Sequence, residues 1–177
     1  MLPDLPALTR CHGCGQLYWL EDAEQLGELD VPGPGRQLPE EWYRAPLAQA
    51  PGIEGYAEAL RGGLASGRDR EQYLRVRLWW AINDLVRGRP GAQIPAEYRD
   101  LFYENLRGLF ALLDEDNPNE RVPKAEVARQ AGDFAEALRL LEEVPPGFQW
   151  AANVIRELAR RGDANVALLN PDGSYSR

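Results

Sequence analysis

The residues best suited to chemistry lie in one run of four near the start of the chain. They are the cysteines Cys11 and Cys14 and the histidine His12. Two thiolates at this spacing can bind one metal ion or form a disulfide, and an imidazole can bind a metal or carry a proton. The 177 residues contain no other cysteine or histidine. Any chemistry that needs these side chains must therefore centre on this run.

The sequence Cys-His-Gly-Cys-Gly over residues 11–15, followed by Tyr18 and Trp19, resembles one knuckle of a zinc ribbon or of rubredoxin. In such knuckles two thiolates hold one metal, and the glycine allows a turn that points backbone amides at the sulfurs. A structural zinc site usually has four Cys or His ligands, and the second knuckle of the family is absent from this chain. Cys11 and Cys14 are therefore candidate zinc ligands of an incomplete site.

Four interpretations of the cysteine pair stay open. The knuckle is a metal-free turn, or zinc is bound and completed by carboxylates such as Glu21 or Asp22 or by a second copy of the chain. Alternatively, Cys11 and Cys14 form a disulfide or act as a redox pair. A thioredoxin-like redox pair needs a strand before it and a helix that carries the second cysteine, whereas here Gly15 and a predicted strand follow.

Little else in the sequence supports an enzyme. With one histidine, any Ser–His or Cys–His machinery would have to include His12. The chain also lacks a phosphate-binding loop of the Walker type. We therefore lean toward a non-enzymatic protein, with a metal- or thiol-dependent activity at the cysteine pair as the alternative.

Charge and composition narrow the class of partner. Twenty Lys and Arg against 28 Asp and Glu give a net charge of −8, which argues against a uniform nucleic-acid-binding surface and leaves only a local basic patch open. No apolar run approaches the roughly 18 residues that span a bilayer, and the start shows no signal-peptide pattern. We expect a soluble cytoplasmic protein whose partner is another protein, and a homodimer is left open.

The segment that must position the cysteines, residues 1–52, is rich in Pro and Gly and poor in helical periodicity. A short strand is predicted at residues 16–20, with the stretch before Cys11 as its hairpin partner. Asp22 is predicted to cap a short helix over residues 23–29. Trp42 and Tyr43 are expected to anchor this segment to a helical body.

From residue 53 the chain is predicted to be a mainly α bundle of about six helices, followed by a flexible tail at residues 170–177. The helical domain spans residues 53–169. Apolar residues of the second helix lie nearly all the way round, so we expect it at the centre of the bundle. Helical periodicity and Pro or Gly breaks place the helices at about residues 53–64, 69–87, 96–113, 123–131, 134–144 and 149–161.

The fourth and fifth predicted helices resemble a tetratricopeptide (TPR) helix pair, with Gly132, Phe134 and Ala137 at the family spacing. Glycine there lets two helices approach, the aromatic ring fills the wedge, and alanine allows close packing. No second copy follows at a 34-residue offset, and solenoids need about three. The hairpin is either a well-packed part of the bundle or the wall of a peptide-binding groove.

Polar residues also fall on apolar helix faces. Asn83, Asp84 and Arg87 lie near the end of the second predicted helix, and Asn105 lies centrally on an apolar face of the third. A buried amide without partners costs about 1–3 kcal/mol, so we predict that these residues bond to one another. The alternative is a pocket for an acidic or planar ligand, lined by Trp79 or Trp80 together with these four residues.

As a whole, the chain resembles uncharacterised bacterial proteins that join a short C-x-x-C-G start to a helical body, a resemblance that implies no activity. The hypothesis we favour from the sequence is a protein-interaction or adaptor module that uses the helical face around the hairpin. A zinc- or thiol-dependent role of Cys11 and Cys14 and a small-ligand site at the second helix are the alternatives.

Overall fold

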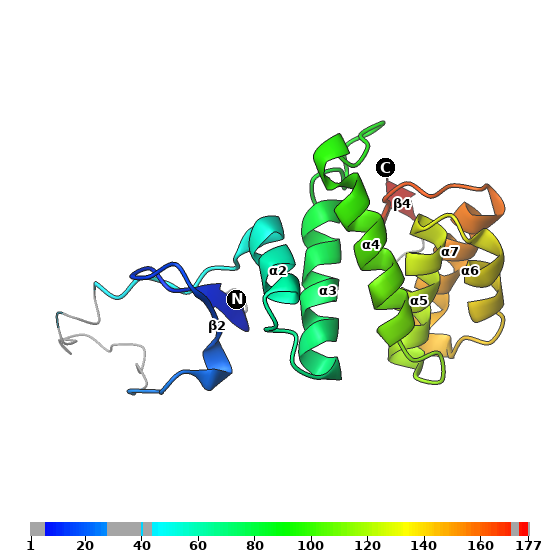
Figure 1. The fold of residues 1–177 in the computed structure, drawn as a ribbon. Coiled ribbons are helices and arrows are strands. Elements are labelled where there is room, and N and C mark those ends of the chain that lie inside the picture. The colour runs from blue at the N-terminus through cyan, green and yellow to red at the C-terminus, as the bar shows by residue number, and fades with distance from the viewer. Residues whose placement is uncertain (1–5, 28–39, 41–43, 171–173, 177) are drawn as a thin grey trace, which may run out of the picture. The chain divides into compact units, whose positions relative to one another are not determined.

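The computed structural model describes residues 6–27, 40, 44–170 and 174–176. By its contacts the chain divides into two compact units, Met1–Gly55 and Tyr56–Arg177. The described part holds six α-helices, labelled α2 to α7, and two small antiparallel strand pairs (Figure 1). None of these helices is both long enough and apolar enough to cross a bilayer. The prediction of a mainly α protein with six helices is confirmed.

The first unit contains the predicted cysteine hairpin. Strand β1 (Leu8–Arg10) pairs antiparallel with β2 (Leu17–Trp19), so that Leu8 lies opposite Trp19. Both of these side chains are buried, which fixes the register of this short pair. The strand predicted at residues 16–20 and its partner before Cys11 are therefore confirmed.

The short helix predicted after Asp22 is wrong over its described residues, 23–27. A single 3-10 turn, η1 (Leu20–Asp22), follows β2, and the backbone at Ala23 is already extended. Leu26 is 83% exposed, so this stretch has no apolar face to bury and a short isolated helix is unstable. Residues 28–29 and the predicted anchors Trp42 and Tyr43 lie outside the described residues.

The six helices follow in order, with α2 beginning at the end of the first unit. Five of them begin and end within four residues of the predicted positions. Their bounds are α2 Gly52–Arg61, α3 Arg68–Asn83, α4 Ala96–Leu112, α5 Pro118–Gln130, α6 Phe134–Leu140 and α7 Gln149–Arg160.

Helix α5 begins five residues before its predicted start at Pro123. The side chain of Asn117 accepts a hydrogen bond from the backbone of Asn119 at 3.1 Å, and Pro118 occupies the first turn. Asparagine as N-cap followed by proline is a helix-start signature, which the sequence analysis interpreted as a loop. Pro123 is accommodated inside the helix instead of starting it.

The packing of the second unit follows the chain order. Helix α3 contacts α4, α4 contacts α5, and α5, α6 and α7 contact one another, as Figure 1 shows. One apolar cluster joins the last three helices and the turn after α6 through Val122, Ala125, Leu140, Leu141, Val144, Ala152 and Ile155. A second cluster consists of Ala128, Ala137 and Ala159, small residues that let the helices approach closely.

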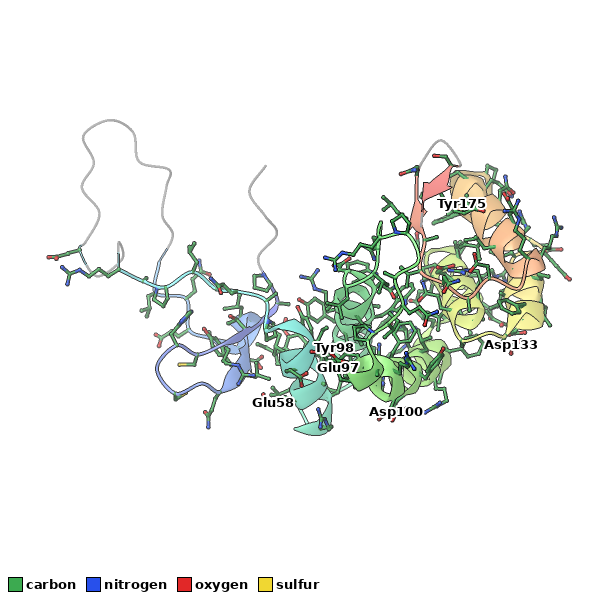
Figure 2. The ribbon with its side chains drawn as sticks, turned by 90° about the horizontal axis from the view of Figure 1, so that it is seen from above. Glu58, Glu97, Tyr98, Asp100, Asp133 and Tyr175 are labelled. Carbon is green, nitrogen blue, oxygen red and sulfur yellow. The ribbon has the colours of Figure 1, made fainter. Side chains whose placement is uncertain are left out.

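After α7 the chain forms a second strand pair. Strand β3 (Leu168–Leu169) pairs antiparallel with β4 (Tyr175–Ser176). The hydroxyl of Tyr175, labelled in Figure 2, accepts a 2.9 Å hydrogen bond from Arg161 at the end of α7. No pattern in the sequence predicts this hairpin, because two-residue strands leave no periodic signal.

Candidate functional site

The turn between β1 and β2 holds both cysteines. The backbone N–H of Cys11 donates to the carbonyl of Gln16 at 2.8 Å, and that of Gly15 donates to the carbonyl of Cys11 at 2.9 Å. Gly15 has a φ of 75°, a left-handed conformation that glycine adopts without steric cost. The sequence C-x-x-C-G thus closes a tight turn that places both thiols at the tip of the hairpin.

Backbone amides of the same turn stabilise one thiolate. The N–H groups of Cys14 and Gly13, and then the Cys14 thiol, donate to the Cys11 sulfur and lower the pKa of the Cys11 thiol. Both cysteines are free, with Cys14 exposed and Cys11 partly exposed. The turn therefore presents two accessible sulfurs, one of which is electrostatically prepared to be an anion.

The surroundings of the turn come from the same unit. The Arg10 guanidinium donates to the carbonyl of Gly15 at 2.6 Å, and Thr9 exchanges two hydrogen bonds with the backbone of Gln49. The His12 ring lies 3.4 Å from the carbonyl of Leu47. A cavity of about 340 Å³ adjoins the turn, lined by Cys11 and His12 among others. Within the described residues no group of three or more His, Cys, Asp and Glu side chains is placed to hold a metal ion, and this includes Glu21 and Asp22.

The polar residues predicted to form one network on α3 and α4 do not all bond to one another. Asp84 and Arg87 form an ion pair at 2.7 Å, but the Nδ2 atom of Asn105 donates to the main-chain carbonyl of Arg75 at 2.9 Å. The Oδ1 atoms of Asn83 and Asn105, both buried, have no hydrogen-bond partner in the described part of the chain. The predicted four-residue network is therefore wrong.

The relative direction of α3 and α4 explains why the predicted four-residue network does not form. Arg68 at the start of α3 bonds to the carbonyl of Leu112 at the end of α4, so the helices are antiparallel. Asn105 consequently lies beside Arg75, two turns before Asn83 along α3. Trp80 is 45% exposed, with the Arg77 guanidinium 5.9 Å from its ring. A ligand-binding role of Trp80, Asn83, Asp84, Arg87 and Asn105 stays a prediction.

The helix pair α5–α6 forms the hairpin that the sequence predicts. Gly132 turns the chain with a φ of 86°, and the Asp133 side chain, labelled in Figure 2, caps α6 by accepting from the backbone of Glu136 at 3.1 Å. Phe134 packs against the small-residue cluster of Ala128, Ala137 and Ala159. The expected roles of glycine in the turn and of alanine in close packing are thus observed.

An apolar groove of about 210 Å³ lies between α4 and α5, next to the turn of this hairpin. Its apolar lining consists of Leu106 and Phe110 of α4 and Val127, Ala128 and Ala131 of α5 and its C-cap. Arg107 and Asp133 are the charged residues that line it. Ala131 and Asp133 are exposed, so the groove opens to solvent at the end of α5.

Helix α5 contains a buried ion pair that was not predicted from the sequence. Arg129 is 0% exposed and makes two bonds to Glu126, at 2.6 and 2.7 Å. Its guanidinium also donates to the carbonyls of Asp163 and Asn165, which follow α7. The sequence signal that could have predicted this ion pair is the spacing of Glu126 and Arg129, three residues apart on a helix. The residues beside them are alanine and valine at buried positions.

The ion pair continues into α3 through an amide. The Nε2 atom of Gln130 donates to Glu126 at 2.8 Å, and its Oε1 atom accepts from the indole of Trp79 at 2.8 Å. Trp79 and Gln130 are both buried. Helices α3 and α5 are thereby joined directly by hydrogen-bonded side chains, without a side chain of α4 between them.

Comparison of the chain with protein-family models, with curated proteins and with solved structures finds no match. The resemblances to a zinc-ribbon knuckle and to a TPR helix pair therefore rest on short motifs and on their local geometry. Function has to be argued from the sites themselves.

Proposed function

We propose that this chain is a non-enzymatic interaction module, and that the groove between α4 and α5 receives an apolar side chain of a partner protein. The observation that carries the proposal is the apolar lining of a groove that is open at Ala131. Its volume of about 210 Å³ is below the ~300 Å³ at which small-molecule pockets begin. That size suits one large side chain better than a free ligand.

The charge of the chain indicates what kind of partner segment would bind in the groove. The chain carries a net charge of −8, which attracts basic segments at a distance and accelerates their association. At the groove itself Asp133 and Arg107 place opposite charges, so the attraction of basic segments comes from the net charge of the chain. The occupant that fits is therefore an amphipathic helix of a partner protein, with a leucine-sized anchor and basic flanking residues.

The experiment uses four labelled twelve-residue peptides whose central residue is Leu or Ala and whose flanks carry Lys or Glu. Fluorescence anisotropy with the full chain should give the tightest binding for the Leu peptide with Lys flanks, by about tenfold over the Ala peptide. Ala131→Trp should abolish this binding by filling the groove, because position 131 has an ordinary helical backbone. Ala135→Trp, on the exposed side of α6, is the matched control.

Asp133→Asn tests the charge separately, because asparagine keeps the N-cap of α6 while it removes the negative charge. We expect the preference for Lys over Glu flanks to shrink in this variant. Equal affinity for the Leu and Ala peptides, or unchanged binding by Ala131→Trp, would contradict the proposal.

A second candidate function is metal binding by the cysteine turn, favoured by the two backbone amides directed at the Cys11 sulfur. Two thiolates supply half of a four-ligand zinc site, and the exposed tip leaves room for two more from a second copy. Native mass spectrometry of the protein with zinc should show one ion per two chains. Cys11→Ser and Cys14→Ser should each remove it, whereas His12→Gln should not.

A further inference from the structure

A second cavity of the helical unit has a different character from the groove. It has a volume of about 320 Å³, within the range of small-molecule pockets. It is open to solvent on one side, where Arg99 and Tyr103 are exposed, and is lined by the start of α4, the loop before it, the end of α5 and the segment after α7. Its apolar walls include Val86, Ile94, Phe102 and Val166. Neither the cysteine turn nor the groove shares a residue with it.

One charged residue lines this cavity among the described residues, and it is basic. Arg99 donates to the carbonyl of Ile94 at 3.3 Å through Nε, and forms no ion pair in the described structure. Its chain neighbours Glu97 and Asp100, labelled in Figure 2, lie on the first turns of α4. A lining that holds one arginine and no carboxylate favours an anion locally, against the long-range repulsion from a chain of net charge −8.

Gln130 lines the same cavity with an amide whose orientation is fixed. It lines the cavity although it is only 3% exposed, and its amide is oriented by two partners. The indole N–H of Trp79 donates to the amide oxygen of Gln130, so this oxygen must face Trp79. The NH₂ group of the same amide must then face the Glu126 carboxylate, to which it donates. One hydrogen of that NH₂ group is bonded to Glu126, and the second has no acceptor within the described residues.

Aromatic rings complete the lining. Phe102 and Tyr103 meet edge to face at 5.5 Å and both line the cavity, and Tyr103 is 44% exposed. An apolar wall with a few convergent donors is the usual construction of a pocket for a small organic molecule. The lining residues that can donate a hydrogen bond to such a molecule include Arg99, Gln130 and Tyr103.

We infer that this cavity binds a small organic anion, a carboxylate carried on an aromatic or branched apolar body. The carboxylate would pair with Arg99 and accept from Gln130, and the apolar body would lie against Phe102. The site is separate from the proposed peptide groove, so either proposal can fail without the other.

The indole N–H of Trp79 provides the readout, because it is bonded to the Gln130 amide that lines the cavity. The chain has five tryptophans, so Trp79→Phe assigns this resonance in a ¹H–¹⁵N spectrum. Titration with naphthalene-2-carboxylate should move the resonance in a saturable way. Naphthalene-2-carboxamide, the neutral analogue, should bind about tenfold more weakly.

Arg99→Gln should weaken binding of the carboxylate about tenfold and leave binding of the amide unchanged, and Arg99→Lys should recover part of the loss. Arg61→Gln, in α2 and outside the cavity, removes the same net charge from an exposed arginine that likewise donates Nε to a main-chain carbonyl, and should have no effect. Equal affinity for the two compounds, carboxylate binding that survives Arg99→Gln, or no saturable shift of the Trp79 resonance would overturn the inference.

Discussion

The buried polar groups of α5 and those of α3 and α4 differ in how completely they are bonded. The Arg129 guanidinium is held by both oxygens of Glu126 and by two main-chain carbonyls. The side chain of Asn105 has one bond and that of Asn83 has none in the described structure, although both are as deeply buried. An unpaired neutral acceptor costs about 1–3 kcal/mol, whereas an unpaired charge costs several. The comparison shows that the ion pair of Arg129 with Glu126 is fully bonded, whereas the two buried amides of α3 and α4 are not.

The largest expected effect comes from removing the charge at the better-bonded site. Arg129→Met should lower the free energy of unfolding by about 3–5 kcal/mol, because it leaves Glu126 buried without its partner. It also frees the carbonyls of Asp163 and Asn165. Urea unfolding followed by circular dichroism measures the loss.

A double variant shows whether the loss is that of an orphaned charge. Glu126→Leu combined with Arg129→Met removes both charges and should be more stable than Arg129→Met alone. If the single variant loses less than about 1 kcal/mol, the ion pair contributes no more than a surface pair does, and the contrast with α3 and α4 disappears.

The two asparagines should respond in opposite directions when each is replaced by leucine. Asn83→Leu removes a buried amide that has no side-chain hydrogen bond, so the free energy of unfolding should rise by about 1 kcal/mol. Asn105→Leu removes the 2.9 Å bond to the Arg75 carbonyl and should lower it by a similar amount. The same urea experiment compares the two variants, and equal effects would mean that the missing bonds do not matter.

The elements with long periodic patterns were the predictable ones. Five helices follow from apolar spacing and from Gly and Pro breaks, and the hairpin turn at Gly132 follows from its spacing to Phe134. The start of α5 was misplaced because Asn117 and Pro118 suit a loop and a helix cap equally well in sequence. Local signals of this kind are decided only by what the helix packs against.

Sites were less predictable than elements. The cysteine turn could be predicted because its two cysteines and its glycine lie within five consecutive residues. The pairing of Arg129 with carbonyls 34 and 36 residues away, and of Gln130 with Trp79, depends on which helix faces meet. For the same reason the predicted network of Asn83 and Asn105 failed, since a helix pattern does not reveal the level at which two helices cross.

The smallest expected effect concerns an arginine at the surface. Arg139 is half exposed and pairs with Glu136 at 2.7 Å and with Glu115 at 2.6 Å. Hydrogen bonding to Arg139 lowers the pKa of both carboxyl groups below the ordinary 4.5. Arg139→Gln should return both pKa values toward that figure, as a carboxyl-detected NMR titration would measure.

The sign of the accompanying stability change follows from the direction of these shifts. Because the folded pKa is the lower one, the pairs stabilise the protein above pH 4.5, and this contribution is lost as the pH falls through the lowered values. In Arg139→Gln the free energy of unfolding should therefore fall less steeply as the pH drops below 4.5. At neutral pH its change should be smaller than the change that Asn83→Leu produces. If its loss at neutral pH matched that of Arg129→Met, burial would not be what separates the two arginines.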